Sequence, residues 1–228
     1  MNLNTQNITT EIEQAAQWLQ QGKLLAYPTE SVWGIGCDAY NEEAVNQILT
    51  IKNRPAEKGM IVVTDNIDRV RPLIDQLPVQ RQQQIIDSWA PQSNKGDASR
   101  DTQQAHTWLL PLPLSKPEIQ SKSKSELTAL AQQDPVIPYW ITGKHNSIAV
   151  RVISHPLIAQ LCEKMVSDNN PYGLIVSTSC NPSGQSPAVT FEQAYAYFKE
   201  DIGYLQGDTL GYTLPSQIRE GLTGNIIR

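Results

Sequence analysis

LLAYPTESVWGIG, residues 24–36, is the stretch from which the fold can best be worked out. Its opening residues, Leu24 to Tyr27, form an apolar run that Pro28 stops, as in a short buried strand. Val32 to Gly36 is also apolar, but its two glycines favour a turn. The polar residues in between, among them Thr29, follow the end of the strand, where ligands collect in open α/β sheets. An ordinary polar turn is the alternative for these residues.

The chain on either side of this stretch alternates between helical and extended patterns. Helices are expected at 8–21, 42–52, 67–74, 79–89, 156–164 and 190–198, strands at 60–63, 147–152 and 173–176, and a short apolar run occupies 108–112. Thr9 or Thr10 is expected to cap the first helix, and Thr190 the last, with Gln193 as its capping-box partner. Strands that alternate with helices predict an α/β fold with a layered sheet.

Two polar segments interrupt this pattern in the middle of the chain. Residues 92–105 have no periodicity, and residues 115–138 are rich in Ser, Lys and Gln, with prolines at both ends. Surface loops have this kind of composition. We therefore expect a single domain over residues 1–228 that carries two polar insertions.

Composition narrows the class of protein. Of the 228 residues, 39% are hydrophobic and 18% charged, as in a globular protein, and the net charge is −5. No run reaches the roughly 18 apolar residues that span a bilayer. Residues 1–12 lack the pattern of a secretory signal, so we expect a cytoplasmic protein. The negative charge argues against a surface that coats nucleic acid, although a local basic cleft is compatible with it.

A cluster of basic side chains follows the second predicted helix. Lys52, Arg54 and Lys58 surround a bend at Pro55. Arginine offers a planar fork that fits phosphate or carboxylate, and lysine offers a mobile point charge. The cluster therefore predicts an anion site. A solvated helix end, with Lys52 complementing the helix dipole, is the alternative.

A second polar cluster follows the strand expected at 173–176. Ser177, Ser179 and Asn181 belong to a run of small hydroxyl and amide residues. Such a run suits the close approach of backbone to a ligand, and a Ser/Thr-rich turn is the alternative. More than a hundred residues separate this run from the basic cluster, so only folding can join them into an anion site. Cys180 has no histidine near it in sequence and is expected to be a passive small residue.

Four ordered motifs of this chain resemble those of the YrdC/TsaC family. They are LAYPTESVWGIGC at 25–37, KNRP at 52–55, SIAVR at 147–151 and STSCN at 177–181; the closing PSQIR and LTG, at 215–219 and 222–224, are similar to the bacterial short form. The resemblance covers nearly the whole chain apart from the two insertions. It implies a twisted mixed α/β sheet, flanked by helices, with a large concave and positively charged cavity.

The resemblance also implies a reaction, because members of this family are threonylcarbamoyl-AMP synthases. We expect the chain to convert L-threonine, bicarbonate and ATP into L-threonylcarbamoyladenylate and pyrophosphate. A separate complex then transfers the threonylcarbamoyl group to an adenosine beside the anticodon of tRNA. Further expectations are Mg²⁺ bound through the ATP phosphates, weak binding of tRNA, and no membrane partner.

The nucleotide-binding positions of the family fall on six residues of this chain. They are Lys52 and Arg54 from its Lys-x-Arg, Ser179 and Asn181 from its Ser-x-Asn, and Thr107 and Ser216, which match a Thr and a Ser near the nucleotide. One departure concerns Thr107. The family's Trp-Pro-Gly-Pro, which precedes this threonine, is replaced here by Trp89-Ala90-Pro91 and the first insertion.

The positions that the resemblance assigns to threonine and its surroundings fall on five residues. They are Thr29 of Pro-Thr-Glu, Lys58, Ser147, Arg151 of Ala-Val-Arg, and Ser177. Arg151 is a candidate to anchor a substrate carboxylate or phosphate, whereas the strand pattern alone leaves its direction open. No covalent nucleophile and no metal-ligating side chain are expected, and the sequence identifies no general base. Positioning and charge stabilisation by lysine and arginine should carry the chemistry.

Two other functions stay open at this point. An RNA-binding or ribosome-maturation module would suit a basic concavity, but the chain has no aromatic ladder and is acidic overall. The other is a carbamoyl-adenylate domain of a hydrogenase-maturation protein. Such domains normally lie beside zinc-finger modules, and this chain has no Cys-x-x-Cys.

Overall fold

The computed structural model describes residues 5–90, 103–112, 137–214 and 216–228. The polar insertions expected at 92–105 and 115–138 lie almost wholly outside these ranges. The described ranges include all eleven residues expected at the site, with Ser216 as the first residue of the last range.

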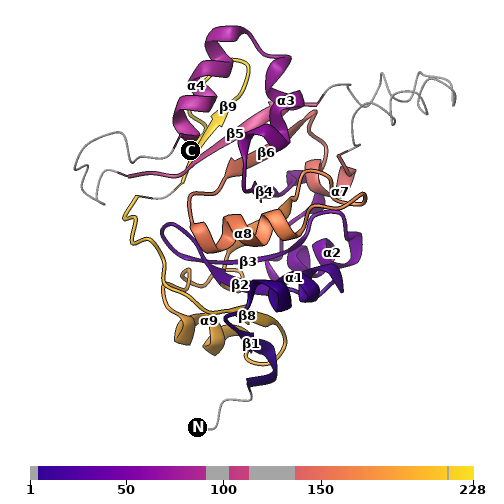
Figure 1. Ribbon diagram of the computed structural model, residues 1–228, viewed down its shortest axis with the longest axis vertical. Coiled ribbons are helices and arrows are strands. Elements are labelled where there is room, and N and C mark those ends of the chain that lie inside the picture. Colours follow the sequence, from indigo (N-terminus) through magenta and orange to yellow (C-terminus); the bar gives the residue numbers. More distant parts are fainter. Residues whose placement is uncertain (1–4, 91–102, 113–136, 215) are drawn as a thin grey trace, which may run out of the picture.

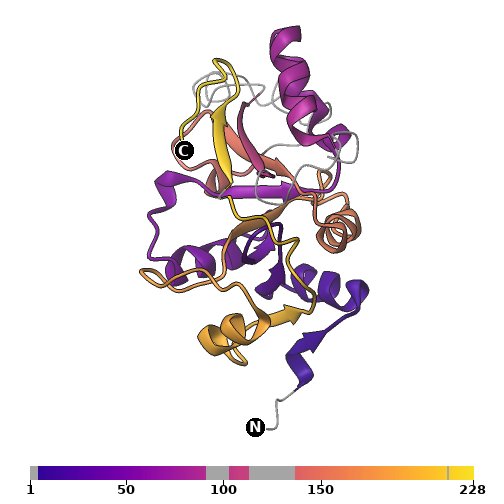
Figure 2. The same cartoon turned by 90° about the vertical axis from the view of Figure 1, so that its left-hand side faces the viewer.

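Nine strands of the described residues form one mixed sheet. In spatial order they are β1 (Ile8–Thr9), β8 (Gly203–Leu205), β2 (Leu25–Pro28), β3 (Trp33–Asp38), β7 (Ile175–Ser179), β4 (Ile61–Thr64), β6 (Ser147–Val152), β5 (His106–Pro111) and β9 (Gln217–Glu220). Parallel pairs such as β4–β6 occur beside antiparallel ones such as β3–β7. Figure 1 shows the order running from β1 at the lower end to β9 at the upper end. Figure 2 shows that the strand direction changes from one end of the sheet to the other, so the sheet is twisted. The expected α/β class with a twisted mixed sheet is confirmed.

Helices cover both faces of the sheet. They are α1 (Ile12–Gln20), α2 (Glu42–Ile51), α3 (Arg71–Asp75), α4 (Val79–Trp89), α7 (Tyr139–Thr142), α8 (Pro156–Lys164) and α9 (Phe191–Phe198), with short 3₁₀ turns η1 (Thr5–Asn7), η2 (Ala56–Lys58) and η3 (Ile67–Val70). α1 and α8 lie on one face (Figure 1), where Leu19 and Leu161 pack with Val63 of β4. α2, α3, α4 and α9 pack on the other face around Val62 and Val150. Among the described helices, none is long and apolar enough to cross a membrane.

Capping residues explain why several helices begin where the sequence predicts. α4, α8 and β6 have the expected bounds, and α2 ends one residue early. Asn41 caps α2 by accepting a hydrogen bond from Ala44 N at 3.0 Å. Thr190 caps α9 as expected, accepting from Gln193 N at 3.3 Å. The Gln193 side chain reaches one residue further back than in a capping box and accepts from Val189 N at 2.8 Å.

The turn expected at 32–36 is wrong, because Trp33–Asp38 is strand β3. β3 pairs with β2 on one side and β7 on the other, so it lies inside the sheet. Its glycines reflect crowding: a Cβ on Gly36 would lie 2.1 Å from the Val176 carbonyl oxygen and 2.6 Å from Tyr27 Oη. The chain reverses earlier, in the polar residues between β2 and β3.

The first helix begins at Ile12, which differs from the expected start at residue 8. Ile8 and Thr9 form β1, which pairs in parallel with β8. Glu11 occupies the N-cap position without a side-chain hydrogen bond, so the expected cap at Thr9 or Thr10 is wrong. Local pattern missed this strand because its partner lies near the other end of the chain.

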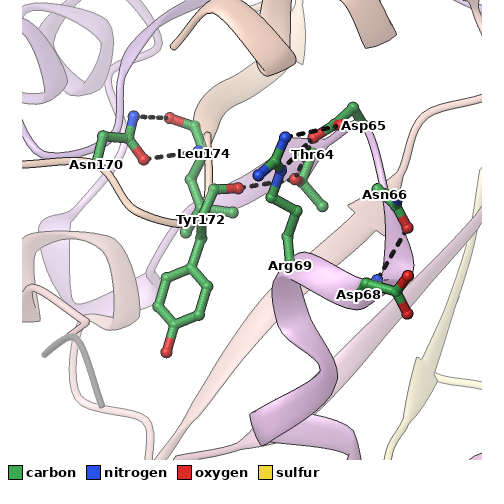
Figure 3. A network of polar contacts seen from close by, with 8 residues as sticks. All are labelled: Thr64, Asp65, Asn66, Asp68, Arg69, Asn170, Tyr172 and Leu174. Atoms are coloured by element: carbon green, nitrogen blue, oxygen red, sulfur yellow. Dashed lines mark hydrogen bonds and ion pairs between the residues drawn. The ribbon is translucent and has the colours of Figure 1, made fainter. Parts of the chain in front are cut away.

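A polar network ties the end of β4 to the loop before β7 (Figure 3). Thr64 Oγ1 donates to the Tyr172 carbonyl oxygen at 2.8 Å. Asn170 bonds the backbone of Leu174 twice, donating to its oxygen at 2.9 Å and accepting from its nitrogen at 2.8 Å. The loop is therefore fixed before β7 enters the sheet beside β4, and β7 carries part of the site.

We expect Gly36→Ala to destabilise the fold by about 3 kcal/mol, because backbone that cannot rotate away occupies the space of the new methyl group. The free energy of unfolding in urea measures the effect. Gly184→Ala is the control: φ is +81° there and nothing lies within 4 Å of a Cβ. It should cost only the left-handed strain of about 1 kcal/mol. Equal losses in both variants would contradict the crowding argument.

Candidate active site

A cavity of about 660 Å³ lies against the sheet. Strands contribute to its lining Gly34 of β3, Ile61 of β4, Ser147, Ala149 and Arg151 of β6, and Ser177 and Ser179 of β7. Gly34 pairs with Ser179, and Ile61 pairs with Ala149, so these residues share a face of the sheet. Further along, α1 and α8 cover that same face, since Val63, two residues beyond Ile61, packs against them.

The cavity exists because the residues that face it are small. Under α1 and α8, Tyr27, Val63 and Ile175 fill the equivalent positions. Beyond the helices, glycine, alanine and serine leave the same face hollow, and packed interiors hold few voids of this size without a function. The strand expected at 173–176 is Ile175–Ser179, so the hydroxyls of Ser177 and Ser179 lie within the strand and alternate onto the cavity face.

Basic side chains give the cavity its charge. Arg54, Lys58, Arg151 and Arg228 line it, and no acidic residue is found among the described lining residues. Arg54 donates from Nε to Gly59 O at 3.0 Å, which orients its guanidinium. Partial burial, and then the charge of Arg228, lower the pKa of Arg54 below its ordinary value. An anion bound between these cations would relieve their repulsion.

Eight of the eleven expected site residues line this cavity. They are Thr29, Arg54, Lys58, Ser147, Arg151, Ser177, Ser179 and Ser216. Folding therefore brings the basic cluster and the hydroxyl-rich run together, as the sequence predicts. The other three, Lys52, Thr107 and Asn181, do not belong to the lining.

The Lys52 ammonium is held by the loop that follows β7. Nζ donates to Asn181 O at 2.8 Å, to Ser179 O at 3.0 Å and to Asn181 Oδ1 at 3.0 Å. With Ser179 Oγ at 3.4 Å the acceptors around Nζ number four, which is enough to engage the three protons of an ammonium group. Burial lowers the pKa of Lys52 from its ordinary value. Lys52 therefore shapes this loop, and its protons are already engaged before any ligand binds.

Asn181 completes the same loop from the other side. Its Nδ2 donates to Gln185 O at 2.7 Å and to Pro182 O at 3.0 Å, while its Oδ1 accepts from Lys52. The whole amide is thus used within the loop. The two residues of the Ser-x-Asn motif consequently divide the work: Ser179 lines the cavity, and Asn181 supports it from behind.

Thr107 lies on the cavity face of β5 but is fully buried. It pairs with Ile218 of β9, and both Ile218 and Leu109, the next residue of β5 on this face, line the cavity. Its hydroxyl has no hydrogen-bond partner within the described residues. A buried hydroxyl in this state is uncommon and costs stability. A polar ligand atom that reached this end of the cavity would satisfy it.

Thr29 lies in the hairpin between β2 and β3 and is 4% exposed. Its hydroxyl donates to Val32 O at 2.7 Å, which uses its single proton. The lone pairs stay available, so Thr29 is suited to accept a hydrogen bond from an amino or hydroxyl group of a ligand.

The expected passive role of Cys180 agrees with its surroundings. Burial raises the pKa of its thiol to about 12, although the nearby Lys52 acts in the opposite direction. The thiolate is the nucleophilic form, so Cys180 is a poor nucleophile near neutral pH. Within the described part of the chain, no group of three or more His, Cys, Asp or Glu side chains is placed to hold a metal ion.

Two titratable side chains that line the cavity were not expected from the sequence: His145, between α7 and β6, and Arg228. Arg228 reaches the cavity because its segment folds back on β9. Ile218 N donates to Arg228 O at 2.8 Å, and Ile227 N donates to Ile218 O at 2.8 Å. A signal was present, since a glycine, Gly224, followed by two isoleucines is typical of a turn and a returning strand. His145 had no such signal.

Comparison with known proteins assigns the family. The family model described as "Telomere recombination" (Sua5_yciO_yrdC) matches residues 17–93 and 99–228. This chain belongs to the Sua5/YciO/YrdC family. Curated members named threonylcarbamoyl-AMP synthase match it over nearly its whole length. One from Psychrobacter arcticus is 53% identical and covers 100% of both chains. One from Acinetobacter baumannii is 44% identical and covers 97% of this chain and 99% of its own.

Solved structures share the fold of this Sua5/YciO/YrdC chain. Sua5 from P. abyssi, crystallised with L-threonine, matches with a TM-score of 0.65 at 24% identity, over 92% of this chain and 50% of that one. E. coli YciO matches with a TM-score of 0.65 at 16% identity, over 95% of this chain and 87% of that one. At these identities the likeness supports the architecture of the mixed sheet and its helices, and the expected family is confirmed by the closer relatives.

In this Sua5/YciO/YrdC chain we expect Lys52→Met to lower the free energy of unfolding by about 2 kcal/mol, because the carbonyl groups of the loop lose a charged donor. Urea denaturation measures the effect. Lys58→Met is the matched control: Lys58 is exposed, and its loss should change stability by less than about 0.5 kcal/mol. An unchanged stability of Lys52→Met would show that the loop keeps its shape without the ammonium group.

Proposed function

We propose that this chain synthesises L-threonylcarbamoyladenylate from L-threonine, bicarbonate and ATP, with release of pyrophosphate. The observation that carries the proposal is the full-length match, at 53% identity, to a relative named threonylcarbamoyl-AMP synthase. The cavity supports it independently, because about 660 Å³ falls in the range of small-molecule sites and its basic lining suits a polyphosphate. The product would serve a separate complex that modifies tRNA beside the anticodon.

Arg54 and Arg228 are the residues we propose for the ATP phosphates. Both line the cavity, and they lie close enough for their charges to interact. Ser179 and Ser216 add hydroxyl groups to the same lining. Arginine forks and hydroxyl donors together satisfy phosphate oxygens in several directions. This set would hold the nucleotide while leaving its α-phosphate open to attack.

Lys52, Asn181 and Thr107 contribute to nucleotide binding from behind the lining. Lys52 and Asn181 hold the loop that presents Ser179. Thr107 is buried beside Leu109 and Ile218, which line the cavity, and its hydroxyl, without a hydrogen-bond partner within the described residues, lies on the same face of the sheet. A Mg²⁺ ion would be bound by phosphate oxygens and water, the hard ligands that it prefers, since the described lining has no carboxylate. When bound, it supplies further neutralisation of the phosphate charge.

The threonine side of the cavity is formed by residues from four separate elements or loops. They are Thr29, Lys58, Ser147, Arg151 and Ser177. Thr29 accepts a hydrogen bond from the amino or hydroxyl group of threonine, because its own proton is engaged with Val32. Arg151 binds the carboxylate, for which its planar guanidinium is well shaped. The two serines and Lys58 complete a polar surface around the reacting groups.

The reaction requires positioning and needs no nucleophilic side chain. The amino nitrogen of threonine forms a bond to the carbon of bicarbonate or carbon dioxide, and the amine proton passes to solvent; bicarbonate also loses its hydroxide. An oxygen of the resulting carbamate then attacks the α-phosphorus of ATP, and the bond to the β-phosphate oxygen breaks, which releases pyrophosphate. Holding both substrates in one cavity favours these encounters, and Arg54 with Arg228 stabilises the charge that develops on pyrophosphate.

Pyrophosphate release from ATP, measured with and without L-threonine and bicarbonate, tests the proposal. We expect release only when both are present, together with a product of the mass of threonylcarbamoyladenylate. Pyrophosphate release at the same rate with and without L-threonine would contradict the proposal. If no pyrophosphate is released and calorimetry detects no binding of ATP or threonine, the proposal is refuted and the RNA-binding function becomes the leading alternative.

Arg54→Ala should lower kcat/KM for ATP by about a hundredfold, because it removes a charge-assisted contact to the phosphates. Arg71→Ala is the matched control, since Arg71 pairs with Asp75 on the exposed surface of α3. Its turnover should stay within about twofold of wild type. Circular dichroism checks that both variants are folded. Wild-type turnover in Arg54→Ala would overturn the role assigned to this arginine.

A further inference from the structure

A buried carboxylate lies directly behind the cavity. Glu30 is 1% exposed and does not line the cavity, whereas its neighbours in the chain, Thr29 and Ser31, do. An ionised carboxylate in such a place is costly unless it is paired or hydrogen-bonded. None of the proposed substrate contacts uses Glu30, so its burial needs another reason.

Both side-chain contacts of Glu30 lie at the end of β6. Its Oε1 accepts a hydrogen bond from Ser154 N at 2.8 Å. Its Oε2 lies 3.7 Å from Arg151 Nη2 and has no hydrogen-bond partner within the described residues. One oxygen therefore fixes the backbone just after β6, and the other faces the guanidinium of the strand's arginine.

Arg151 needs this counter-charge. Its side chain is 12% exposed, so most of the guanidinium is withdrawn from water, yet part of the residue lines the cavity. On β4 its register partner is Val63, which belongs to the apolar cluster under α1 and α8. Within the described ranges, Glu30 is the one carboxylate at ion-pair distance from it. A largely buried cation without a partner would be strongly unfavourable.

We propose that Glu30 is a positioning residue, which holds Arg151 in the direction from which it binds the carboxylate of the amino-acid substrate. This inference rests on the proposed function, in which Arg151 is that anchor. The contact with Glu30 involves Nη2 alone, at 3.7 Å, and because a guanidinium carries five N–H donors, Arg151 keeps N–H groups for an incoming anion. A guanidinium that is already oriented before the substrate arrives loses less conformational entropy on binding than one that must first be ordered, so the substrate binds more tightly.

The backbone of the hairpin keeps Glu30 itself in place. Leu210 N donates to Thr29 O at 3.2 Å, and Tyr212 N donates to Glu30 O at 2.9 Å. The segment between β8 and β9 therefore fixes two adjacent residues with different tasks. Thr29 meets the substrate from the cavity side, and Glu30 orients Arg151 from behind.

Glu30→Gln tests the proposal, because it removes the charge and keeps both the size of the side chain and an oxygen for Ser154 N. We expect KM for L-threonine to rise about tenfold, with KM for ATP changed by less than about twofold. Calorimetry with L-threonine and with L-threoninamide, which lacks the carboxylate, gives a second readout. The wild-type protein should bind L-threonine more tightly than L-threoninamide, and the ratio of the two dissociation constants should be closer to one in Glu30→Gln. Glu163→Gln, at an exposed position of α8, should leave both readouts unchanged.

A double-mutant cycle with Arg151→Met separates positioning from a general effect on stability. If Glu30 acts through Arg151, Glu30→Gln adds nothing to the threonine KM of Arg151→Met. If either single variant fails to fold, the double variant, in which both charges are gone, should recover folding, and that recovery measures the same coupling.

Three results would overturn the proposal: a further loss of threonine affinity in the double variant, equal rises of KM for threonine and ATP in Glu30→Gln, or no recovery of folding in the double variant. A wild-type protein that releases no pyrophosphate would refute the proposed function instead. In that case the calorimetric comparison of L-threonine with L-threoninamide still decides whether Glu30 orients an anion site.

Discussion

The rest of the structure depends on one constraint: on one face of β3, the positions of Gly34 and Gly36 have no room for a side chain. A Cβ on Gly36 would meet the Val176 carbonyl oxygen at 2.1 Å, and one on Gly34 would meet the Tyr27 ring at 2.9 Å. Because side chains alternate along a strand, the intervening Ile35 fills the core on the opposite face. The sheet is therefore packed on one side and partly hollow on the other, and the hollow part is the cavity.

The charged groups around the cavity differ in what they are free to do. Lys52 has its three protons engaged by the end of β7 and the loop after it, so it determines the shape of that loop. Arg54 donates its Nε proton to the Gly59 carbonyl oxygen, and N–H donors of its guanidinium stay available for a ligand. Arg151 faces the buried Glu30. An acidic protein thus concentrates positive charge at one place, where neutral oxygens satisfy Lys52, Glu30 balances Arg151, and Arg54 has no ion-pair partner within the described residues.

The sequence predicted most of the secondary structure correctly where local signals were sufficient. α4, α8 and β6 follow from apolar periodicity, and α9 begins at its threonine cap. The errors occurred where a distant segment decides the conformation. β3 was expected to be a turn because its glycines suggested local flexibility. They are glycines because Tyr27 and β7 leave no room for a Cβ atom. β1 was missed because its partner β8 is remote in the chain.

The same division holds for the site. The sequence alone determined most of its inventory, since the motifs around Thr29, Arg54, Ser179 and Arg151 contain most of the polar residues that line the cavity, and residue type fixes what each can donate or accept. Only the tertiary structure decided which of them face the cavity. Lys52 and Asn181 turned out to support the lining from behind, Arg228 joined it through a returning segment, and Glu30 became the partner of Arg151. Burial, charge pairing and direction arise between segments distant in sequence, so no local pattern can specify them.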